Sequence, residues 1–262
     1  MIFIKRRYMK KYKVKIYKEN KLIEIFNLLS KEGFKKISKY WIRSGWDNKH
    51  VYTFTWLGRP IIQLPEDLIR LQEFLFVEKP DLIIETGIAH GGGLIFYSNI
   101  MRSIKKKFQI IGIDIDIRSH NLKAIKKHAE YKKKFIKMFV GSSTEKKIVQ
   151  KVIPSLKKSK KSIIILDSNH SFQHVYDELN TYSKLLKKGS YIIACDAIEP
   201  FLGDDAPRLR NNYMKDNPLV AIKKFLKNNK NFELMEPKFL FNESVINQRV
   251  TYWPQCYLKK IR

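Results

Sequence analysis

The stretch Asp81-Leu-Ile-Ile-Glu-Thr-Gly-Ile-Ala-His-Gly-Gly-Gly93 decides the fold, because it reads as a strand, a glycine-rich turn and the start of a helix. Its apolar run, Leu82 to Ile84, suits a strand that is buried on both faces of a parallel sheet. Gly87 permits a sharp exit from that strand, and the glycines at 91–93 let a ligand approach the backbone. Residues 94–101 read as an apolar crossover helix. The stretch therefore predicts one βα unit whose helix N-terminus faces a ligand.

The glycine spacing indicates which ligand this turn holds. It reads Gly-x-x-x-Gly-Gly-Gly, which differs from the Gly-x-Gly-x-x-Gly of dinucleotide sites. The spacing favours S-adenosylmethionine over NAD, because backbone N–H groups near Gly91 and Gly92 can hold the carboxylate of its methionine part. A turn that serves packing alone is the alternative.

The next strand predicts the ribose ligand of the same cofactor. Phe108 to Ile117 is a buried run that ends in acids. Asp114 follows the glycine turn by about 20 residues, the separation at which a carboxylate accepts hydrogen bonds from ribose hydroxyls. Asp116 is the weaker candidate, since it can instead cap the following helix or pair with Arg118.

A third strand, Phe135 to Val140, runs into Gly141-Ser-Ser-Thr144. Ser142 and Ser143 are expected to line the adenine pocket. Capping of the next helix by Ser143 or Thr144 is an equal alternative, because hydroxyl side chains favour that position.

Two further strands end in carboxylates and predict a metal site. Asp167 ends the run Ser162 to Leu166, and Asp196 follows Tyr191 to Cys195. Neighbouring parallel strands lie about 4.8 Å apart, so both acids can reach one divalent cation. Mg²⁺ fits, because it needs few carboxylates and keeps waters that a substrate can replace. Asn169 is expected to add a carbonyl ligand.

His170 is the expected general base, because it shares a loop with these ligands and titrates near neutrality. Two alternatives stay open. His170 and His174 have the spacing of a zinc pair, although no third ligand matches them and a helix-terminus role for His174 is favoured. Asp167 can also act only as a helix cap.

The order of elements predicts an α/β fold with a doubly wound, mostly parallel, Rossmann-like sheet. Residues 1–64 are assigned to a helical N-terminal extension and a pocket roof, and 65–262 to the main domain. Lys21 to Lys31 has helical spacing and is expected to pack on the sheet or against a second subunit in a homo-oligomer. Pro65 begins a helix to Glu78, Asn217 caps another through Leu226, and Arg249 to Leu258 is a late strand, taken as antiparallel.

Composition limits the classes of binding partner and the cellular compartment that the sequence allows. The chain has 262 residues and a net charge of +27, but its lysines are spread over many segments and no nucleic-acid motif accompanies them. Nucleic-acid binding is therefore not expected. The basic surface, helped by Lys5 to Lys15, can instead hold the protein near anionic membrane or attract phosphate-bearing substrates, and charge alone does not choose between these two partners. Cys195 and Cys256 suit a reducing, cytoplasmic location, and no signal or transmembrane segment is predicted. The irregular residues 198–216 are expected to act as a lid.

Taken together, five motifs resemble the cephalosporin hydroxylase family over about residues 39–261. They are Trp56-Leu-Gly-Arg-Pro-Ile-Ile-Gln63, Ile84-Glu-Thr-Gly-Ile-Ala-His-Gly-Gly92, Gly112-Ile-Asp-Ile-Asp-Ile-Arg118, Leu166-Asp-Ser-Asn-His170 with His174-Val175, and Arg249-Val-Thr-Tyr-Trp-Pro254.

The resemblance implies a class I S-adenosylmethionine-dependent fold with a Mg²⁺ site, and relatives that methylate sugars. It places Glu85, Gly87 and Asp114 on the cofactor, and Asp167, Asn169 and Asp196 on the metal. His90, in the same glycine turn, is also expected at the cofactor site. Cys195 departs from the pattern, because some members carry an acid there.

The sequence thus predicts a methyltransferase that uses S-adenosylmethionine and Mg²⁺ to methylate a sugar hydroxyl in surface glycan, lipopolysaccharide or natural-product assembly. Cofactor binding without methyl transfer and a basic adaptor are the rival hypotheses. An iron oxygenase needs two histidines and a carboxylate. His128 and Glu130 formally begin such a triad, but they lie in a lysine-rich surface helix.

Overall fold

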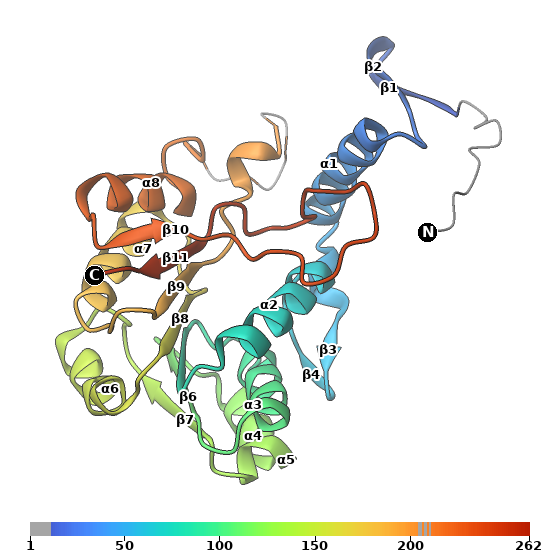
Figure 1. Cartoon of the computed structure of the whole chain (residues 1–262). Helices are drawn as coiled ribbons and strands as arrows, with labels where there is room; N and C mark the ends of the chain where they lie inside the picture. Colours follow the sequence, from blue (N-terminus) through green and yellow to red (C-terminus); the bar gives the residue numbers. More distant parts are fainter. Residues whose placement is uncertain (1–11, 204–205, 207–208, 210) are drawn as a thin grey trace.

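The structure is a computed structural model that describes residues 12–203, 206, 209 and 211–262. Its centre is a seven-stranded sheet in the order β10-β11-β9-β8-β5-β6-β7 (Figure 1). The strands are β5 (Leu82–Thr86), β6 (Gln109–Asp114), β7 (Ile136–Val140), β8 (Ser162–Leu166), β9 (Tyr191–Ala194), β10 (Phe232–Leu234) and β11 (Tyr257–Lys260).

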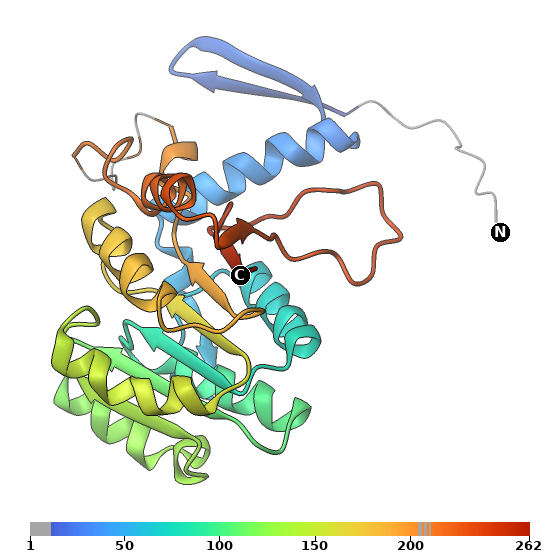
Figure 2. The same ribbon diagram turned by 60° about the vertical axis from the view of Figure 1, so that its left-hand side comes forward.

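Helices alternate with these strands and cover the two faces of the sheet. Figure 2 shows the teal helix α2 and the gold helix α7 on opposite sides of it. The larger helices are α2 (Pro65–Glu78), α3 (Gly92–Ile104), α4 (Ser119–Lys127), α5 (Ala129–Lys132), α6 (Lys146–Lys158), α7 (Phe172–Ser183) and α8 (Pro218–Asn228). The predicted helices at Pro65 and Pro218 are confirmed, and the Asn217 side chain accepts from the Val220 N–H at 3.0 Å.

The doubly wound arrangement is confirmed by the strand pairing. β5 lies between β6 and β8, and both pairs are parallel. All five residues of β5 and of β8 are buried, as expected for strands that helices cover on both faces. The chain leaves β5 toward β6 and β7 and returns to its other side at β8. The carboxyl ends of β5 and β8 are therefore a switch point, where ligands bind in such sheets.

The late strand differs in extent from its prediction. β11 is antiparallel to β9, as expected, but it spans only Tyr257–Lys260, and β10 pairs with its other edge. Residues 249–256 are irregular. Arg249 to Trp253 instead lies against α2, where the Tyr252 N–H donates to the buried Asp67 carboxylate at 2.7 Å. This contact prevents the segment from joining the sheet earlier.

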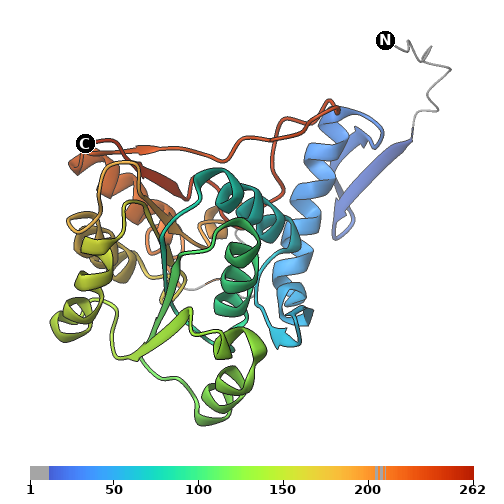
Figure 3. The same cartoon turned by 60° about the horizontal axis from the view of Figure 1, so that its bottom comes forward.

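The helix predicted at Lys21 to Lys31 is wrong. Strand β1 (Lys13–Lys18) pairs antiparallel with β2 (Lys21–Asn27), so the chain forms a hairpin there, and the helix α1 (Lys31–Asp47) begins later, after its cap Ser30. Lysines alternate with apolar residues in β1, a period-2 pattern that outweighs the apparent helical spacing of β2. The extension is therefore a hairpin packed on helix α1. The C-terminal half of α1 packs on the sheet domain through Ile42 and Trp46, and the hairpin lies away from the sheet (Figure 3).

Between α1 and α2 the chain forms short elements above the sheet edge: η1 (His50–Thr53), β3 (Thr55–Trp56) and β4 (Arg59–Pro60). Trp56 packs edge to face on Phe96 of α3, with ring centroids 4.9 Å apart. This contact fixes residues 56–63 over the carboxyl ends of the strands, where a pocket roof was predicted. None of the helices in the described residues has the length and apolar character needed to cross a membrane.

The lid predicted at 198–216 is only partly visible. A short 3₁₀ helix, η2 (Glu199–Phe201), follows Asp196, and Asp216 at the other end accepts from the Phe172 N–H at 2.6 Å. Residues 204–205, 207–208 and 210 lie outside the described residues. So do most of Lys5 to Lys15, the basic segment that can help to hold the protein near anionic membrane.

Candidate metal and cofactor site

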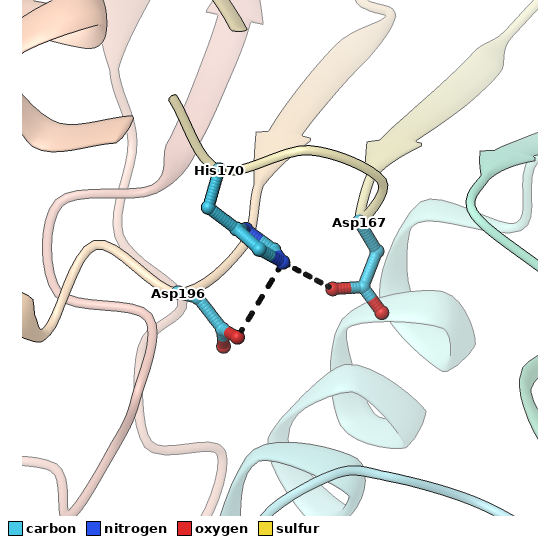
Figure 4. A group of neighbouring side chains, drawn as sticks. All are labelled: Asp167, His170 and Asp196. Carbon is cyan, nitrogen blue, oxygen red and sulfur yellow. Dashed lines mark ion pairs between the residues drawn. The ribbon is translucent and has the colours of Figure 1, made fainter. Parts of the chain in front are cut away.

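Asp167, His170 and Asp196 form a cluster at the carboxyl ends of β8 and β9 (Figure 4). The His170 Nε2 atom lies 3.7 Å from Asp196 Oδ2 and 4.0 Å from Asp167 Oδ1. One ligand atom from each residue lies within 4.8 Å of the other two. Such a spacing allows the three groups to surround one cation.

The sheet itself brings the two acids together. The Asp167 N–H donates to the Thr86 carbonyl at 3.0 Å, which extends the β5–β8 pairing by one residue. The Cys195 N–H donates to the Leu166 carbonyl at 2.9 Å, and Asp196 then turns into the left-handed region at φ 57°. A non-glycine residue in that conformation is uncommon and often marks a functional site. The turn aims the Asp196 carboxylate toward Asp167.

The electrostatics of the two carboxylates, Asp167 and Asp196, favour a bound cation. Burial raises the pKa of Asp167 well above its usual value, and the charge of Asp196 raises it further. Burial also raises the pKa of Asp196. Two carboxylates that share a site repel each other when ionised, and a divalent cation removes that cost. The two carboxylates therefore fit a divalent metal, with the His170 imidazole beside them.

His170, rather than Asn169, completes the cluster. The exposed Asn169 side chain accepts from the Ser171 N–H at 2.9 Å and closes a tight turn. This turn swings His170 back over the two carboxylates. Asp167 does not cap a helix, because Ser171 caps α7. Cys195, the departure from the family pattern, is buried, and burial raises the pKa of its thiol well above the usual value.

The glycine turn lines a cavity of about 240 Å³ beside the cluster. Glu85, Gly87, His90 and Gly92 all face this cavity. Gly92 lies so close to the Pro60 carbonyl that an added Cβ would approach its oxygen to 2.2 Å. The helix α3 begins here without a side-chain cap, so the N–H groups of its first turn are available to a ligand.

Glu85 is the buried acid of this cavity. Tyr97 donates to its Oε1 at 2.7 Å, whereas its Oε2 has no hydrogen-bond partner among the described residues. Burial raises the pKa of Glu85 to about 8. A buried acceptor without a partner is costly, and a ligand with an N–H donor would satisfy it.

The other expected cofactor residues do not line this cavity. The Asp114 Oδ2 atom accepts from the N–H groups of Ile88 and Ala89, at 2.7 and 3.2 Å, and so holds the glycine turn. Gly91 lies behind the cavity, against Ile125, and Ser142 and Ser143 lie in the loop after β7. Asp116 is exposed, and α4 begins without a side-chain cap.

The alternatives left open by the sequence are resolved by local contacts. Ser143 and Thr144 do not cap α6, whose N-cap residue is Glu145. His174 Nε2 lies 3.4 Å from Glu178, away from His170, so the two histidines form no zinc pair. Glu130 is buried and pairs with Arg102 at 2.9 Å, which gives it a structural role.

A second cavity of about 480 Å³ lies on the other side of the cluster. Trp46, Tyr52 and Tyr252 supply its aromatic walls, and His170 and Asp196 lie at its base. Tyr52, Ser168, His170 and Asp196 line both cavities. The cluster therefore stands at the junction of two cavities.

Two residues of the roof segment support the site and were not predicted. The Gln63 amide donates to Asp167 Oδ2 at 2.7 Å. Arg59 donates from Nε to the His90 carbonyl at 3.1 Å and thereby holds the turn of the glycine loop. Both belong to the motif Trp56 to Gln63, so the resemblance was the available signal for them.

Comparison with known proteins identifies relatives of this chain. Residues 48–261 match the sequence model of the family described as rhamnosyl O-methyltransferase/CmcI. The rhamnosyl O-methyltransferase of Mycobacterium tuberculosis (strain ATCC 25618 / H37Rv) is 32% identical over 145 residues, 55% of this chain and 56% of that protein. That of Mycobacterium leprae (strain TN) is 29% identical over 147 residues, 55% of this chain and 61% of that protein. The match thus spans little more than half the length of these relatives.

Two solved structures share the fold. An apo structure of CmcI has a TM-score of 0.53 and 17% identity, and covers 80% of this chain and 77% of that chain. A CmcI structure with Mg and SAM has a TM-score of 0.51 and 16% identity, and covers 80% of this chain and 78% of that chain. The expected class I methyltransferase type of α/β fold is confirmed. The chain belongs to the rhamnosyl O-methyltransferase/CmcI family.

Proposed function

We propose that this protein is an S-adenosylmethionine-dependent, Mg²⁺-assisted O-methyltransferase that acts on a sugar hydroxyl in surface glycan, lipopolysaccharide or natural-product assembly. The observation that carries the proposal is the position of the Asp167–His170–Asp196 cluster between two cavities. A methyl donor in one cavity and an acceptor in the other would meet at the metal. The relatives named rhamnosyl O-methyltransferase support a sugar as acceptor.

The glycine cavity is the proposed cofactor site. Glu85, Gly87, His90 and Gly92 would hold the methionine part, with Gly91 supporting the turn from behind, and the free Oε2 of Glu85 suits the ammonium group of the methionine part. Asp114 is proposed for the ribose, with Ser142 and Ser143 for the adenine. Asp114 already holds the glycine turn through one oxygen, so its ribose contact would use the remaining lone pairs.

Asp167 and Asp196 are the proposed metal ligands, with Asn169 near the rim. When bound, Mg²⁺ would lower the pKa of a substrate hydroxyl and orient its oxygen. His170 is proposed as the base that removes the hydroxyl proton, and Asp167 is proposed to assist it from 4.0 Å away. An iron oxygenase is disfavoured, because the cluster offers two carboxylates and one histidine, the reverse of the two histidines and one carboxylate in its triad.

The cavity walled by Trp46, Tyr52 and Tyr252 is the proposed acceptor site. Residues 1–64 are proposed as the extension and pocket roof, and residues 65–262 as the catalytic domain. Tyr52 is 56% exposed although it lines both cavities, so its ring offers a face to a ligand. Sugar rings present C–H groups that pack well on such faces, while their hydroxyls reach the polar base. A pyranose therefore suits both the walls and the base of this cavity.

Methyl transfer tests the proposal directly. We expect the protein, given labelled S-adenosylmethionine and delipidated rhamnose-containing glycans, to label the glycan, and mass spectrometry to find one added methyl group per modified residue. EDTA should remove the activity and Mg²⁺ should restore it. Labelling that EDTA leaves unchanged would contradict the metal role, and transfer to protein or nucleic acid alone would contradict the sugar acceptor.

The hairpin β1–β2 is the proposed contact with anionic membrane, from a cytoplasmic location consistent with two free buried cysteines. It exposes Tyr17, Leu22, Ile23 and Ile25 beside Lys13, Lys15, Lys18 and Lys21. Lysines beside apolar side chains favour anionic lipid and oppose pairing of like surfaces in a homo-oligomer.

Vesicle sedimentation distinguishes these two partners. We expect the protein to bind phosphatidylglycerol vesicles but not phosphatidylcholine vesicles, and Ile23→Ser and Ile25→Ser to weaken the binding. Equal binding to both lipids would contradict the proposal. A dimer in light scattering that Ile25→Ser dissociates would assign the hairpin to self-association instead.

A further inference from the structure

Helix α7 carries a buried polar stripe that the proposed chemistry does not use. His174, Glu178 and Tyr182 are spaced four residues apart, so they lie along one face of the helix. Glu178 and Tyr182 are fully buried. Polar side chains on the core face of a helix are costly unless they are hydrogen-bonded. Their contacts should therefore reveal what the stripe does.

The first partner of the stripe is the loop that carries the metal cluster. Ser168 lies between Asp167 and His170, and its Oγ donates to Glu178 Oε1 at 3.1 Å. The same Oγ lies 3.1 Å from His174 Nε2, so it accepts there while it donates to the glutamate. The hydrogen bond to Glu178 raises the pKa of His174 despite partial burial, and both the imidazolium and the neutral tautomer with its hydrogen on Nε2 can donate to Ser168. The stripe thus holds the middle of the metal loop.

The second partner is the loop after β7, the proposed adenine side of the cofactor site. Ser143 is buried there, with its Oγ 3.3 Å from the same His174 Nε2. The Tyr182 hydroxyl donates to the Ser143 carbonyl at 2.8 Å. One helix face therefore contacts both loops, and the Nε2 atom of His174 lies within hydrogen-bond distance of a serine in each of them.

We propose that the His174–Glu178–Tyr182 stripe is a positioning device that couples metal binding to cofactor binding. The inference rests on the proposed function. A cation bound by Asp167 would order the metal loop, and Ser168, the next residue, would transmit that order through His174 to Ser143. Coupling between two sites is reciprocal, so each ligand should tighten the binding of the other.

Calorimetry with S-adenosylhomocysteine, with and without Mg²⁺, tests the coupling. For the wild type we expect Mg²⁺ to lower the Kd of S-adenosylhomocysteine by about fivefold or more. In His174→Gln and Glu178→Gln this ratio should fall to about one, while binding without Mg²⁺ changes less. Asp177→Asn is the matched control, because Asp177 lies on the exposed face of the same helix and pairs with Gln173.

Two further variants keep the test decisive if His174→Gln or Glu178→Gln does not fold. Ser168→Ala removes the contact of the metal loop, and Tyr182→Phe removes one hydroxyl without changing the packing. Both should reduce the ratio. A wild-type ratio of one, or an unchanged ratio in folded His174→Gln and Ser168→Ala, would overturn the coupling. Failure of the wild type to bind S-adenosylhomocysteine at all would instead overturn the proposed function.

Discussion

Asp196→Ala should lower methyl transfer by about 100-fold or more, because a catalytic metal contributes several kcal/mol of charge stabilisation and each 1.36 kcal/mol is tenfold in rate. The variant removes one of the two carboxylates of the cluster. Direct titration should show a matching loss of Mg²⁺ affinity. Asp177→Ala, at an exposed position on α7, is the control and should retain both activity and metal binding.

Asp196→Asn separates charge from backbone conformation. Asparagine tolerates the left-handed region better than alanine does, so the φ of 57° at this position is kept. Without metal, this variant should be at least as stable as the wild type in urea, because the repulsion that raises the pKa of Asp167 is gone. Mg²⁺ should stabilise the wild type alone. An Asn variant that binds Mg²⁺ and methylates as the wild type does would refute the metal assignment.

Gly87→Ala should disrupt both halves of the site at once. A Cβ at Gly87 would lie 2.1 Å from the Asp167 carbonyl oxygen and 2.8 Å from the Ser168 Cα atom, which are rigid backbone atoms. Its φ of 87° adds about 1 kcal/mol of conformational cost for alanine, and the clash adds about 1 to 3 kcal/mol. We expect urea unfolding to report a loss of about 2 to 4 kcal/mol as the sum of these terms.

The same variant should weaken S-adenosylhomocysteine binding by about tenfold or more, because relief of the clash moves the glycine turn away from the loop that carries the proposed metal ligand Asp167. Gly189→Ala is a matched control, since Gly189 has a φ of 82° and open space where the Cβ would stand. It should cost about 1 kcal/mol and leave binding unchanged. Equal losses in the two variants would show that the contact with Asp167 does not matter.

Sequence reasoning succeeded where burial is uniform along a strand. The runs at Ile83 and Ile164 are apolar on both faces, so they specify central strands, and the acids that follow such strands must lie at one edge of the sheet. Asp167 and Asp196 could be paired on this basis. The hairpin at residues 13–27 was missed because its strands have little buried surface. The apolar positions of β2 therefore fit the period of a helix as well as the period of a strand.

The remaining site residues depend on contacts between distant segments. Gln63 meets Asp167 only because Trp56 packs on Phe96, and no local pattern encodes that contact. His170 joins the carboxylates through a tight turn at Asn169, which the sequence suggested as a ligand. Side-chain direction in a short loop depends on such hydrogen bonds, and these are not visible in spacing alone.

The central claim is that the glycine cavity beside the cluster holds S-adenosylmethionine. Isothermal titration of the wild-type protein with S-adenosylhomocysteine in the presence of Mg²⁺ tests it most directly. The account predicts saturable binding of one molecule per chain, competed by S-adenosylmethionine and removed by Gly92→Trp, whose side chain has no room beside the Pro60 carbonyl and would displace the wall of the cavity. A well-folded wild type that gives no binding signal with S-adenosylhomocysteine, or that binds NAD instead, would contradict the account.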